Sequence, residues 1–366
     1  MSDLKFGMYV EFQCPPGQDH AELINDVIAA AEHLDDHGFS SFNTLEHPWF
    51  PKFAINVAPM PLFVKLAERT RNLRFRTLCH TLPLHNPMVL AGEIAETDIL
   101  TNGRIDCGIG RGHGWLQEPA NIPFEESLGR FNEAIEILIN GWTKERFDFH
   151  GQYYTCENLE IVPKPIQKPH PPIYQVGTSS KSFTQAGQRG WNIVIGGPAP
   201  TSLFVEPYNV YVDSCKSAGN TPNVGYVKAI YLDEDEKVAM REAETAAMRF
   251  IEYNTSPLFE MDRPEEKRER LRAGGFHFYA VDDFLKLRDL SFQDLVDMEI
   301  VFVGTPEKVT QQFLKLYDTI QYDELIIISN YGGMELNKTI KNQELFARKV
   351  APALRRAIAE KKKAAE

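Results

Sequence analysis

Short apolar runs alternate with segments of helical periodicity along almost the whole chain of 366 residues. This alternation is typical of repeated βα units around a parallel sheet. Eight strands are predicted, at Leu4–Phe12, Phe42–Leu45, Leu73–Cys79, Arg104–Gly110, Ile173–Val176, Asn192–Ile195, Val224–Leu232 and Glu324–Ser329. Eight such units favour a closed (β/α)8 TIM barrel over an open doubly wound sheet. No linker divides the pattern, so we predict one domain that spans residues 1–366.

Helical periodicity fills the intervals between the predicted strands. The clearest helices are predicted at Ala21–His37, Val89–Leu100, Ser127–Thr143 and Asn342–Arg356. A hairpin is predicted over Phe147–Cys156, because strand-like residues flank His150-Gly151. The chain ends in a lysine-rich stretch, so residues from about 357–366 are expected to form a flexible tail.

A charged segment interrupts the alternation at about residues 254–298. It carries the dense charge run Asp262–Arg270, then Gly274-Gly275, then the aromatic residues Phe276, Phe278 and Tyr279. One interpretation is a helical excursion with a solvated face. The other is a lid over the carboxyl-terminal mouth of the barrel, with Gly274-Gly275 as its hinge.

The charge balance narrows the classes of partner. Asp and Glu number 51 against 39 Lys and Arg, a net charge of −12, which disfavours nucleic acid and anionic membranes. The first residues lack the basic and apolar regions of a signal peptide, and no apolar run of about 18 residues occurs. The five cysteines are widely spaced and form no C-x-x-C motif. We therefore expect a cytoplasmic protein that does not span a membrane.

Polar and glycine-rich segments follow the predicted strands. In a (β/α)8 barrel the active site lies at the carboxyl ends of the strands, so these segments are expected to meet. They are Glu46-His47, Leu78-Cys79-His80, Gly108–Gly114, Gly177–Ser182 and Gly196-Gly197.

The glycine-rich segment Gly108–Gly114 differs from a dinucleotide-binding loop. It lacks the G-x-G-x-x-G spacing, and no helix begins directly after it. Its glycines would let a flat ligand approach the backbone, and the forked guanidinium of Arg111 suits a phosphate. The alternative is a glycine turn that contains a structural arginine.

Two further segments allow a functional and a structural interpretation. The start of the helix at Thr178–Ser182 offers backbone N–H groups, hydroxyls and an ammonium to an anion, although a serine there would also serve as an N-cap. His47 could act as a general acid or base near neutral pH, or it could be structural. No histidine has metal-ligand spacing, so no metal site is predicted.

The ordered motifs resemble the bacterial luciferase-like flavin monooxygenases over nearly the full length. They are Glu46-His47, Leu82-Pro83, Asn86-Pro87, Asn102-Gly103-Arg104, Gly108–Gly112, Arg130, Pro171-Pro172-Ile173 and Gly304-Thr305-Pro306-Glu307. The resemblance implies a (β/α)8 barrel, often a homodimer. It also implies that reduced FMN from a separate flavin reductase reacts with oxygen through a carbon-4a flavin peroxide.

The resemblance assigns residues by position. The phosphate of FMN would be bound by Arg111, Arg130, Ser179, Lys181 and Ser182. Other cofactor contacts would come from Glu46, Gly110, Val176 and the strand-three bulge at Leu78-Cys79, which is frequently a cis peptide in the family. His47 would steer protons near the flavin. The substrate pocket would be lined by Phe12, Trp49, Phe50, His113 and Trp115, although such aromatic residues also serve in ordinary packing.

The chain departs from the luciferases at several of these positions. Pro48 replaces a second histidine, Gly110 a cysteine, Gly197 an aromatic residue and Lys181 a hydroxyl. Light emission is therefore not expected, and the substrate is predicted to be a small, largely apolar molecule. The alternatives are a deazaflavin-dependent enzyme that transfers hydride, and a non-catalytic flavin-binding barrel.

Overall fold

A computed structural model describes residues 4–177, 179–260, 264–276 and 282–365. Eight parallel strands close into a ring in the order β1-β2-β3-β5-β8-β9-β10-β12, and β12 pairs again with β1. Their bounds are β1 Lys5–Val10, β2 Ser41–Thr44, β3 Arg74–Thr77, β5 Ile105–Gly110, β8 Ile173–Val176, β9 Asn192–Gly196, β10 Val224–Leu232 and β12 Glu324–Ile328. This closed ring confirms the predicted (β/α)8 barrel.

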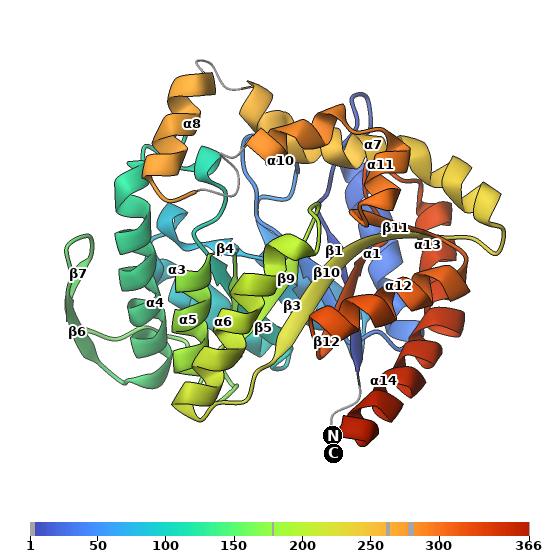
Figure 1. Cartoon of the computed structure of the whole chain (residues 1–366). Helices are drawn as coiled ribbons and strands as arrows, with labels where there is room; N and C mark the ends of the chain where they lie inside the picture. The colour runs from blue at the N-terminus through green and yellow to red at the C-terminus, as the bar shows by residue number, and fades with distance from the viewer. Residues whose placement is uncertain (1–3, 178, 261–263, 277–281, 366) are drawn as a thin grey trace.

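Helices surround the ring, and the two chain ends lie side by side at the end of the barrel opposite the inserted helices (Figure 1). The surrounding helices are α1 His20–Asp36, α2 Pro59–Arg69, α3 Pro87–Leu100, α4 Ser127–Thr143, α5 Ser180–Arg189, α6 Ser202–Ala218, α7 Glu236–Glu260, α12 Pro306–Thr319, α13 Leu336–Leu345 and α14 Ala351–Ala365. The segment expected to be a flexible tail is thus helical through Ala365. None of the helices in the described part of the chain is long and apolar enough to cross a membrane.

Four short strands lie outside the ring or extend it. The predicted hairpin is present as β6 Phe147–His150 and β7 Thr155–Leu159, and β4, His80–Thr81, extends the pairing with β5. The sequence analysis missed β11, Val301–Gly304, which pairs with the second half of β10. Because β10 is nine residues long, its second half projects beyond its pairing with β12 and supplies an edge for β11.

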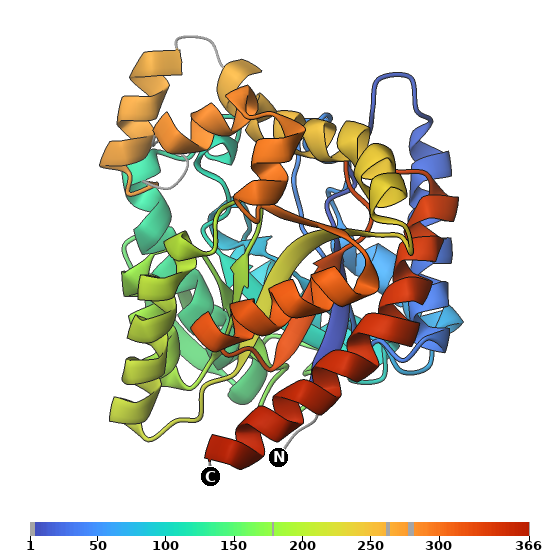
Figure 2. The same ribbon diagram turned by 45° about the vertical axis from the view of Figure 1, so that its right-hand side comes forward.

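The inserted segment covers the carboxyl-terminal end of the barrel (Figure 2). It comprises the end of α7, then α8 Pro264–Ala273, α10 Asp282–Lys286 and α11 Phe292–Asp297. Phe276 and Phe284 from this segment are buried in one apolar cluster with Leu78 and Val194 from the barrel. Phe278 and Tyr279 lie outside the described residues. The segment therefore has the position of a lid, and its motion stays a prediction.

The amino-terminal end of the barrel interior is closed by charged side chains. Arg76 on β3 contacts Asp106 at 2.9 Å and Glu324 at 3.0 Å, and all three are buried. The ring of Tyr174 lies 3.7 Å from the Arg76 guanidinium carbon. Arg74, at the edge of this network, forms a second ion pair with Asp106. Two arginines thus face two carboxylates, and this balance offsets the cost of burying the charges.

Candidate active site

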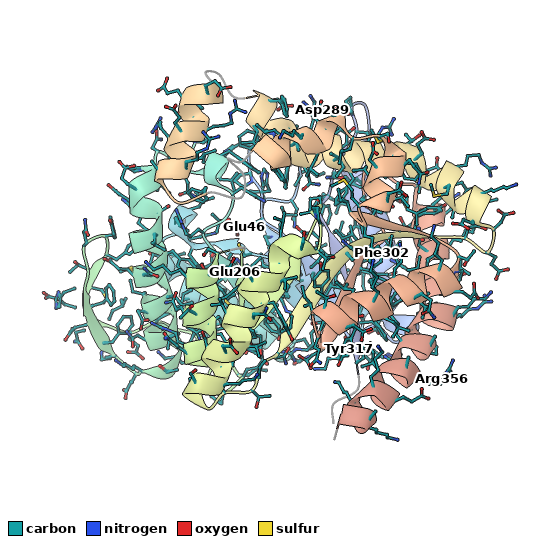
Figure 3. The ribbon with its side chains drawn as sticks, viewed as in Figure 1. Glu46, Glu206, Asp289, Phe302, Tyr317 and Arg356 are labelled. Carbon is teal, nitrogen blue, oxygen red and sulfur yellow. The ribbon has the colours of Figure 1, made fainter. Side chains whose placement is uncertain are left out.

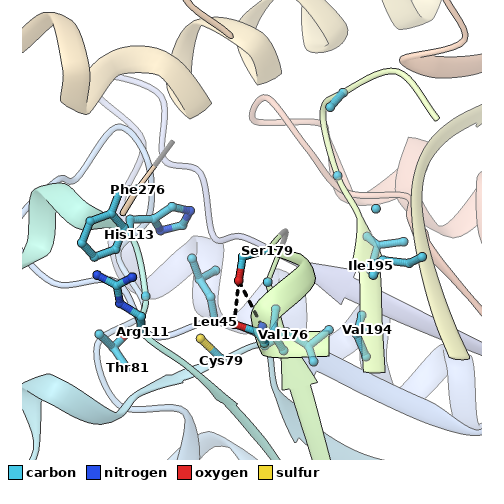
Figure 4. A pocket seen from close by; sticks show the side chains of 18 of the residues that line it. Leu45, Cys79, Thr81, Arg111, His113, Val176, Ser179, Val194, Ile195 and Phe276 are labelled. Atoms are coloured by element: carbon cyan, nitrogen blue, oxygen red, sulfur yellow. Dashed lines mark hydrogen bonds between the residues drawn. The ribbon is translucent and has the colours of Figure 1, made fainter. Parts of the chain in front are cut away.

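A cavity opens at the carboxyl ends of the barrel strands, beneath the inserted segment (Figure 4). It contains about 1420 Å³ of space, open solvent included. The lining residues include Tyr9, Glu11, Glu46, Phe53, Leu78, Cys79, Arg111, His113, Trp115, Gln175, Val176, Ser179, Ser182, Asn254, Phe276 and Phe284. Seven of the predicted cofactor residues are among them, namely Glu46, Leu78, Cys79, Arg111, Val176, Ser179 and Ser182.

Arg111 brings the only cationic side chain that the described residues contribute to the cavity wall. Its Nη2 donates to Ser127 Oγ at 2.7 Å and to the carbonyl of Gly274 at 2.5 Å, and the ring of Phe276 lies 4.0 Å from the guanidinium carbon. Burial lowers the pKa of Arg111 to about 10, so the group stays charged at neutral pH. Among the described residues Arg111 has no carboxylate partner, so its charge is available to an anion in the cavity.

Ser179 and Ser182 present their hydroxyls at the start of α5. Ser179 caps the helix by accepting from the backbone N–H of Ser182 at 3.3 Å, and the two hydroxyl oxygens lie 2.8 Å apart (Figure 4). Capping and anion binding are compatible here, because the pair lines the cavity. The adjoining Thr178 lies outside the described residues.

Two residues predicted to bind the phosphate lie away from the cavity. Lys181 is exposed and lines an outer groove between α4 and α5. Arg130 donates twice to Glu126, at 3.0 and 2.7 Å, and is not part of the cavity wall. In this structure neither side chain is placed to contact a ligand in the cavity.

The bulge after β3 forms the floor of the cavity. The peptide bond between Leu78 and Cys79 is cis, as the resemblance implied. Gly110 does not itself line the cavity, but a Cβ atom there would lie 2.3 Å from Cys79 Sγ. Glycine at this position therefore makes room for Cys79, and Val176 forms the neighbouring wall.

Glu46 is a buried anion at the end of β2 (Figure 3). Although burial opposes ionisation, hydrogen bonds from His80 and His85 hold the pKa of Glu46 at about 2. The carboxylate also accepts from the backbone N–H of Thr81 at 2.6 Å. The ligand-type atoms of Glu46, His80 and His85 lie within 4.8 Å of one another, a set that metals accept, yet the hydrogen bonds already satisfy the carboxylate.

His47 is fully buried and does not line the cavity. Its Nε2 accepts a hydrogen bond from the indole of Trp115 at 2.9 Å, and its ring stacks on Phe53 at 4.0 Å between centroids. Burial first, and then the nearby His113, lower the pKa of His47 well below its ordinary value. The neutral imidazole lies behind the wall formed by Phe53, Trp115 and His113, so a direct role in proton transfer stays a prediction.

Two of the five residues predicted for the substrate pocket line the cavity. His113 and Trp115 line the cavity and stack at 4.4 Å between ring centroids. Phe12 is buried in the core outside the cavity, and Trp49 is 53% exposed. Phe50 packs around His47 without reaching the cavity.

The sequence analysis missed several polar residues of the wall, above all Glu11, Gln175 and Asn254. Glu11 directly follows β1, just as Glu46 follows β2 after a short interval. The predicted strand Leu4–Phe12 ran past the observed end of β1 at Val10, so Glu11 was placed inside the strand and not after it. Asn254 lies within α7, where no strand end marks it.

The chain matches the luciferase-like monooxygenase family over residues 4–322, and it belongs to that family. It is 30% identical over 350 residues to the uncharacterized protein y4wF of Sinorhizobium fredii, covering 93% of this chain and 94% of that protein. It is 26% identical over 288 residues to an FMNH2-dependent dimethylsulfone monooxygenase of Pseudomonas putida, covering 74% and 71%. F420-dependent glucose-6-phosphate dehydrogenases also match.

The fold resembles that of the oxygenating constituent of 3,6-diketocamphane monooxygenase from Pseudomonas putida, a Type II Baeyer-Villiger monooxygenase solved in complex with FMN. The TM-score is 0.78 at 22% identity, and the match covers 96% of this chain and 98% of that one. At this identity the likeness establishes the fold alone. Family and fold together define an oxidoreductase whose relatives use either a flavin or F420.

Proposed function

We propose that the protein is the oxygenase component of a two-component monooxygenase, which uses reduced FMN and oxygen to oxygenate a small, largely apolar organic molecule. The observation that carries this proposal is one cavity whose wall combines groups suited to an anion with apolar aromatic residues. Arg111 and the hydroxyls of Ser179 and Ser182 offer donors to a phosphate, while Phe53, Trp115 and other aromatic residues supply apolar surface.

The cavity offers contacts to both the phosphate and the ring system of FMN. Arg111, Ser179 and Ser182 would bind the phosphate, and Leu78, Cys79 and Val176 would contact the ring system. When bound, reduced FMN would supply the electrons that activate oxygen. The separate flavin reductase, which the resemblance to luciferase-like monooxygenases implies, belongs to the same proposal.

The aromatic wall gives the protein its own part in the reaction. Trp115 and Phe53 are almost fully buried, and Phe276 and Phe284 close the cavity from the inserted segment. Such a wall excludes bulk water, which protects a reactive oxygenating species from premature decay. His113 lines the same part, and burial lowers its pKa to about 3, so that it is a neutral hydrogen-bonding group there.

The charge of the cavity favours FMN over a deazaflavin with a long acidic tail. Arg111 is the single cationic residue among the described residues of the wall, and Glu46 adds a negative charge. A polyanionic tail would require further cations at the mouth. Hydride transfer from reduced F420 is therefore the second candidate, supported by the F420-dependent relatives.

The test is to mix the protein with reduced FMN, then with oxygenated buffer, and to follow absorbance by stopped flow. We expect a species distinct from reduced and oxidised FMN that persists for seconds and decays faster when a substrate is added. Direct return to oxidised FMN with every candidate substrate, together with oxygen-independent turnover of reduced F420, would contradict the proposal and favour the second candidate.

A homodimer is also proposed, with α3 in the contact. Val89 and Leu100 lie three turns apart on one face of α3 and are 57% and 54% exposed. Val162, which is 65% exposed, borders α3 at Gly92. Light scattering after size-exclusion chromatography should give twice the chain mass, and Leu100→Lys should shift the mass toward a single chain.

A further inference from the structure

Glu11 is a carboxyl group on the cavity wall that the proposed function leaves without a role. It directly follows β1, and β1 lies opposite β8 in the ring of eight strands. Glu11 therefore lies across the barrel mouth from Ser179 and Ser182, on the side away from the proposed phosphate site. The side chain lines the cavity although the residue is only 5% exposed.

One oxygen of Glu11 is fully occupied. Oε2 accepts from Asn254 Nδ2 and from Gln13 Nε2, both at 2.9 Å. These donors are fixed in turn, because Gln13 Oε1 accepts from the backbone N–H of Gly332 at 2.8 Å and Asn254 Nδ2 also donates to the carbonyl of Phe250. The amides therefore cannot rotate to offer an acceptor to Glu11 without losing backbone contacts.

The other oxygen is left for a ligand. Glu11 Oε1 makes no hydrogen bond within residues 4–177, 179–260, 264–276 and 282–365. A proton on this carboxyl must reside on Oε1, because Oε2 already accepts two hydrogen bonds. A protonated Glu11 would thus direct one O–H donor into the cavity.

The surroundings of Glu11 disfavour its charged form. Burial raises its pKa to about 8, and the hydrogen bond from Asn254 only partly opposes this effect. No lysine or arginine pairs with it among the described residues. The titratable groups that share its cavity wall are Tyr9, Glu46, Cys79, Arg111 and His113. From α7 it is faced by the uncharged Asn254.

We propose that Glu11 is a neutral carboxylic acid whose Oε1–H donates a hydrogen bond to the oxygen of an uncharged, carbonyl-type substrate. This proposal rests on the proposed function for the identification of the cavity as a substrate pocket. The apolar residues nearby would hold the body of the molecule, and Glu11 would fix the position of its oxygen. A cationic substrate would instead require the carboxylate form.

The first experiment reads the protonation of Glu11 directly, without cofactor or turnover. Infrared difference spectra of wild-type minus Glu11→Gln protein should show a carboxylic-acid C=O band at neutral pH, replaced by carboxylate bands with a midpoint near pH 8. Glu68→Gln, at an exposed position on α2, is the control and should leave that band in place. A carboxylate signal for Glu11 at pH 7 would overturn the proposal.

The second experiment tests the substrate class by calorimetric titration of the FMN-loaded protein. The probes are cyclohexanone, methylenecyclohexane, which has the same shape without an acceptor, and N-methylpyridinium, a cation. Affinity for cyclohexanone should fall roughly three- to tenfold between about pH 6.5 and about pH 9.5, as the donor is lost. Glu11→Gln should abolish this dependence, and Glu11→Met should bind weakly throughout.

Three results of the titration would overturn the proposal. The first is a cyclohexanone affinity that does not change over this pH range. The second is wild-type protein that binds N-methylpyridinium but not cyclohexanone, with the binding of the cation lost in Glu11→Gln. The third is an equal pH dependence with methylenecyclohexane. Failure of the proposed function is distinguishable. It would appear as an FMN affinity that is unchanged in Arg111→Ala, while the infrared band of Glu11 would be unaffected.

Discussion

The two ends of the barrel interior differ in whether their buried charged groups form ion pairs. At the amino-terminal end, Arg76 is paired with Asp106 and Glu324. At the carboxyl-terminal end, neither Glu11 nor Arg111 forms an ion pair with the described residues. The paired groups stabilise the closed end of the barrel, whereas the unpaired ones are available to a ligand. We therefore expect substitutions at the closed end to change mainly the free energy of unfolding, and substitutions at the open end to change mainly the free energy of ligand binding.

The largest expected effect is at the closed end. Arg76→Met would leave Glu324 buried without a cationic partner, and breaking such a pair costs about 3–5 kcal/mol. Chemical denaturation should report this loss of unfolding free energy. Arg74→Met is the matched control, because Arg74 is 35% exposed and its loss should cost clearly less. Equal effects of the two substitutions would break the comparison.

Lys228 on β10 is a buried cation without the pairing that Arg76 has. It faces the ring of Phe302 at 5.0 Å, and its Nζ has no acceptor in the described part of the chain. Burial lowers its pKa to about 7, below the ordinary 10.5, despite the opposing effect of Glu299. Between these values the unfolded chain binds a proton that the folded chain lacks, so stability rises with pH, by at most about 1.4 kcal/mol per unit.

We therefore predict that wild-type protein and a Lys228 variant differ in how the free energy of unfolding depends on pH. Lys228→Met should remove this rise between about pH 7 and pH 10.5. Denaturation curves of wild-type protein and variant at several pH values measure it, and the exposed Lys65→Met on α2 is the control. Parallel pH profiles for wild-type protein and Lys228→Met would contradict the assigned effect.

At the open end, substitutions should affect binding more than folding. Arg111→Ala should weaken FMN by roughly 1.5–3 kcal/mol, or about ten- to hundredfold, as expected for a charged hydrogen bond. Arg130→Ala is the control, because Arg130 does not line the cavity and should change the affinity little. Fluorescence titration of FMN separates the two. If Arg130→Ala were as harmful as Arg111→Ala, the phosphate site would extend to α4.

The smallest effect is expected at the wall between the cavity and His47. Trp115→Phe removes the indole donor to His47 Nε2 and should cost about 1 kcal/mol of unfolding free energy. Because that hydrogen bond favours the neutral imidazole, the pKa of His47 should also rise. Proton NMR titration of the His47 ring measures the change. An unaltered ring signal would show that the indole does not control this histidine.

The alternation of apolar strands and helices was enough to predict the barrel, because every barrel strand buries both faces. The same pattern did not reveal β11, which directly follows the charged segment that interrupts the alternation. Its partner is the projecting half of β10, a feature of the closed ring rather than of local sequence.

Side-chain placement separates the predicted site residues that line the cavity from those that do not. Glu46 and Glu11 line the cavity, while their neighbours His47 and Phe12 are buried outside it. On α5, Ser179 and Ser182 are three residues apart and share one face, whereas Lys181 is turned away. Sequence position brought these residues to the cavity end of the barrel, but it did not distinguish the side chains that line the cavity from their neighbours along the chain.

The hydrogen bond from Arg111 to the Gly274 carbonyl makes the inserted segment sensitive to what the cavity holds. An anion that binds the guanidinium must share it with Gly274 and Phe276, which already contact it. The coupling is reciprocal: a ligand that strengthens the docking of the segment binds more tightly when the segment is docked, and a ligand that weakens the docking binds less tightly. The covering helices and the cofactor site are therefore one coupled unit, and hydrogen exchange in α8 would report on occupancy from outside the cavity.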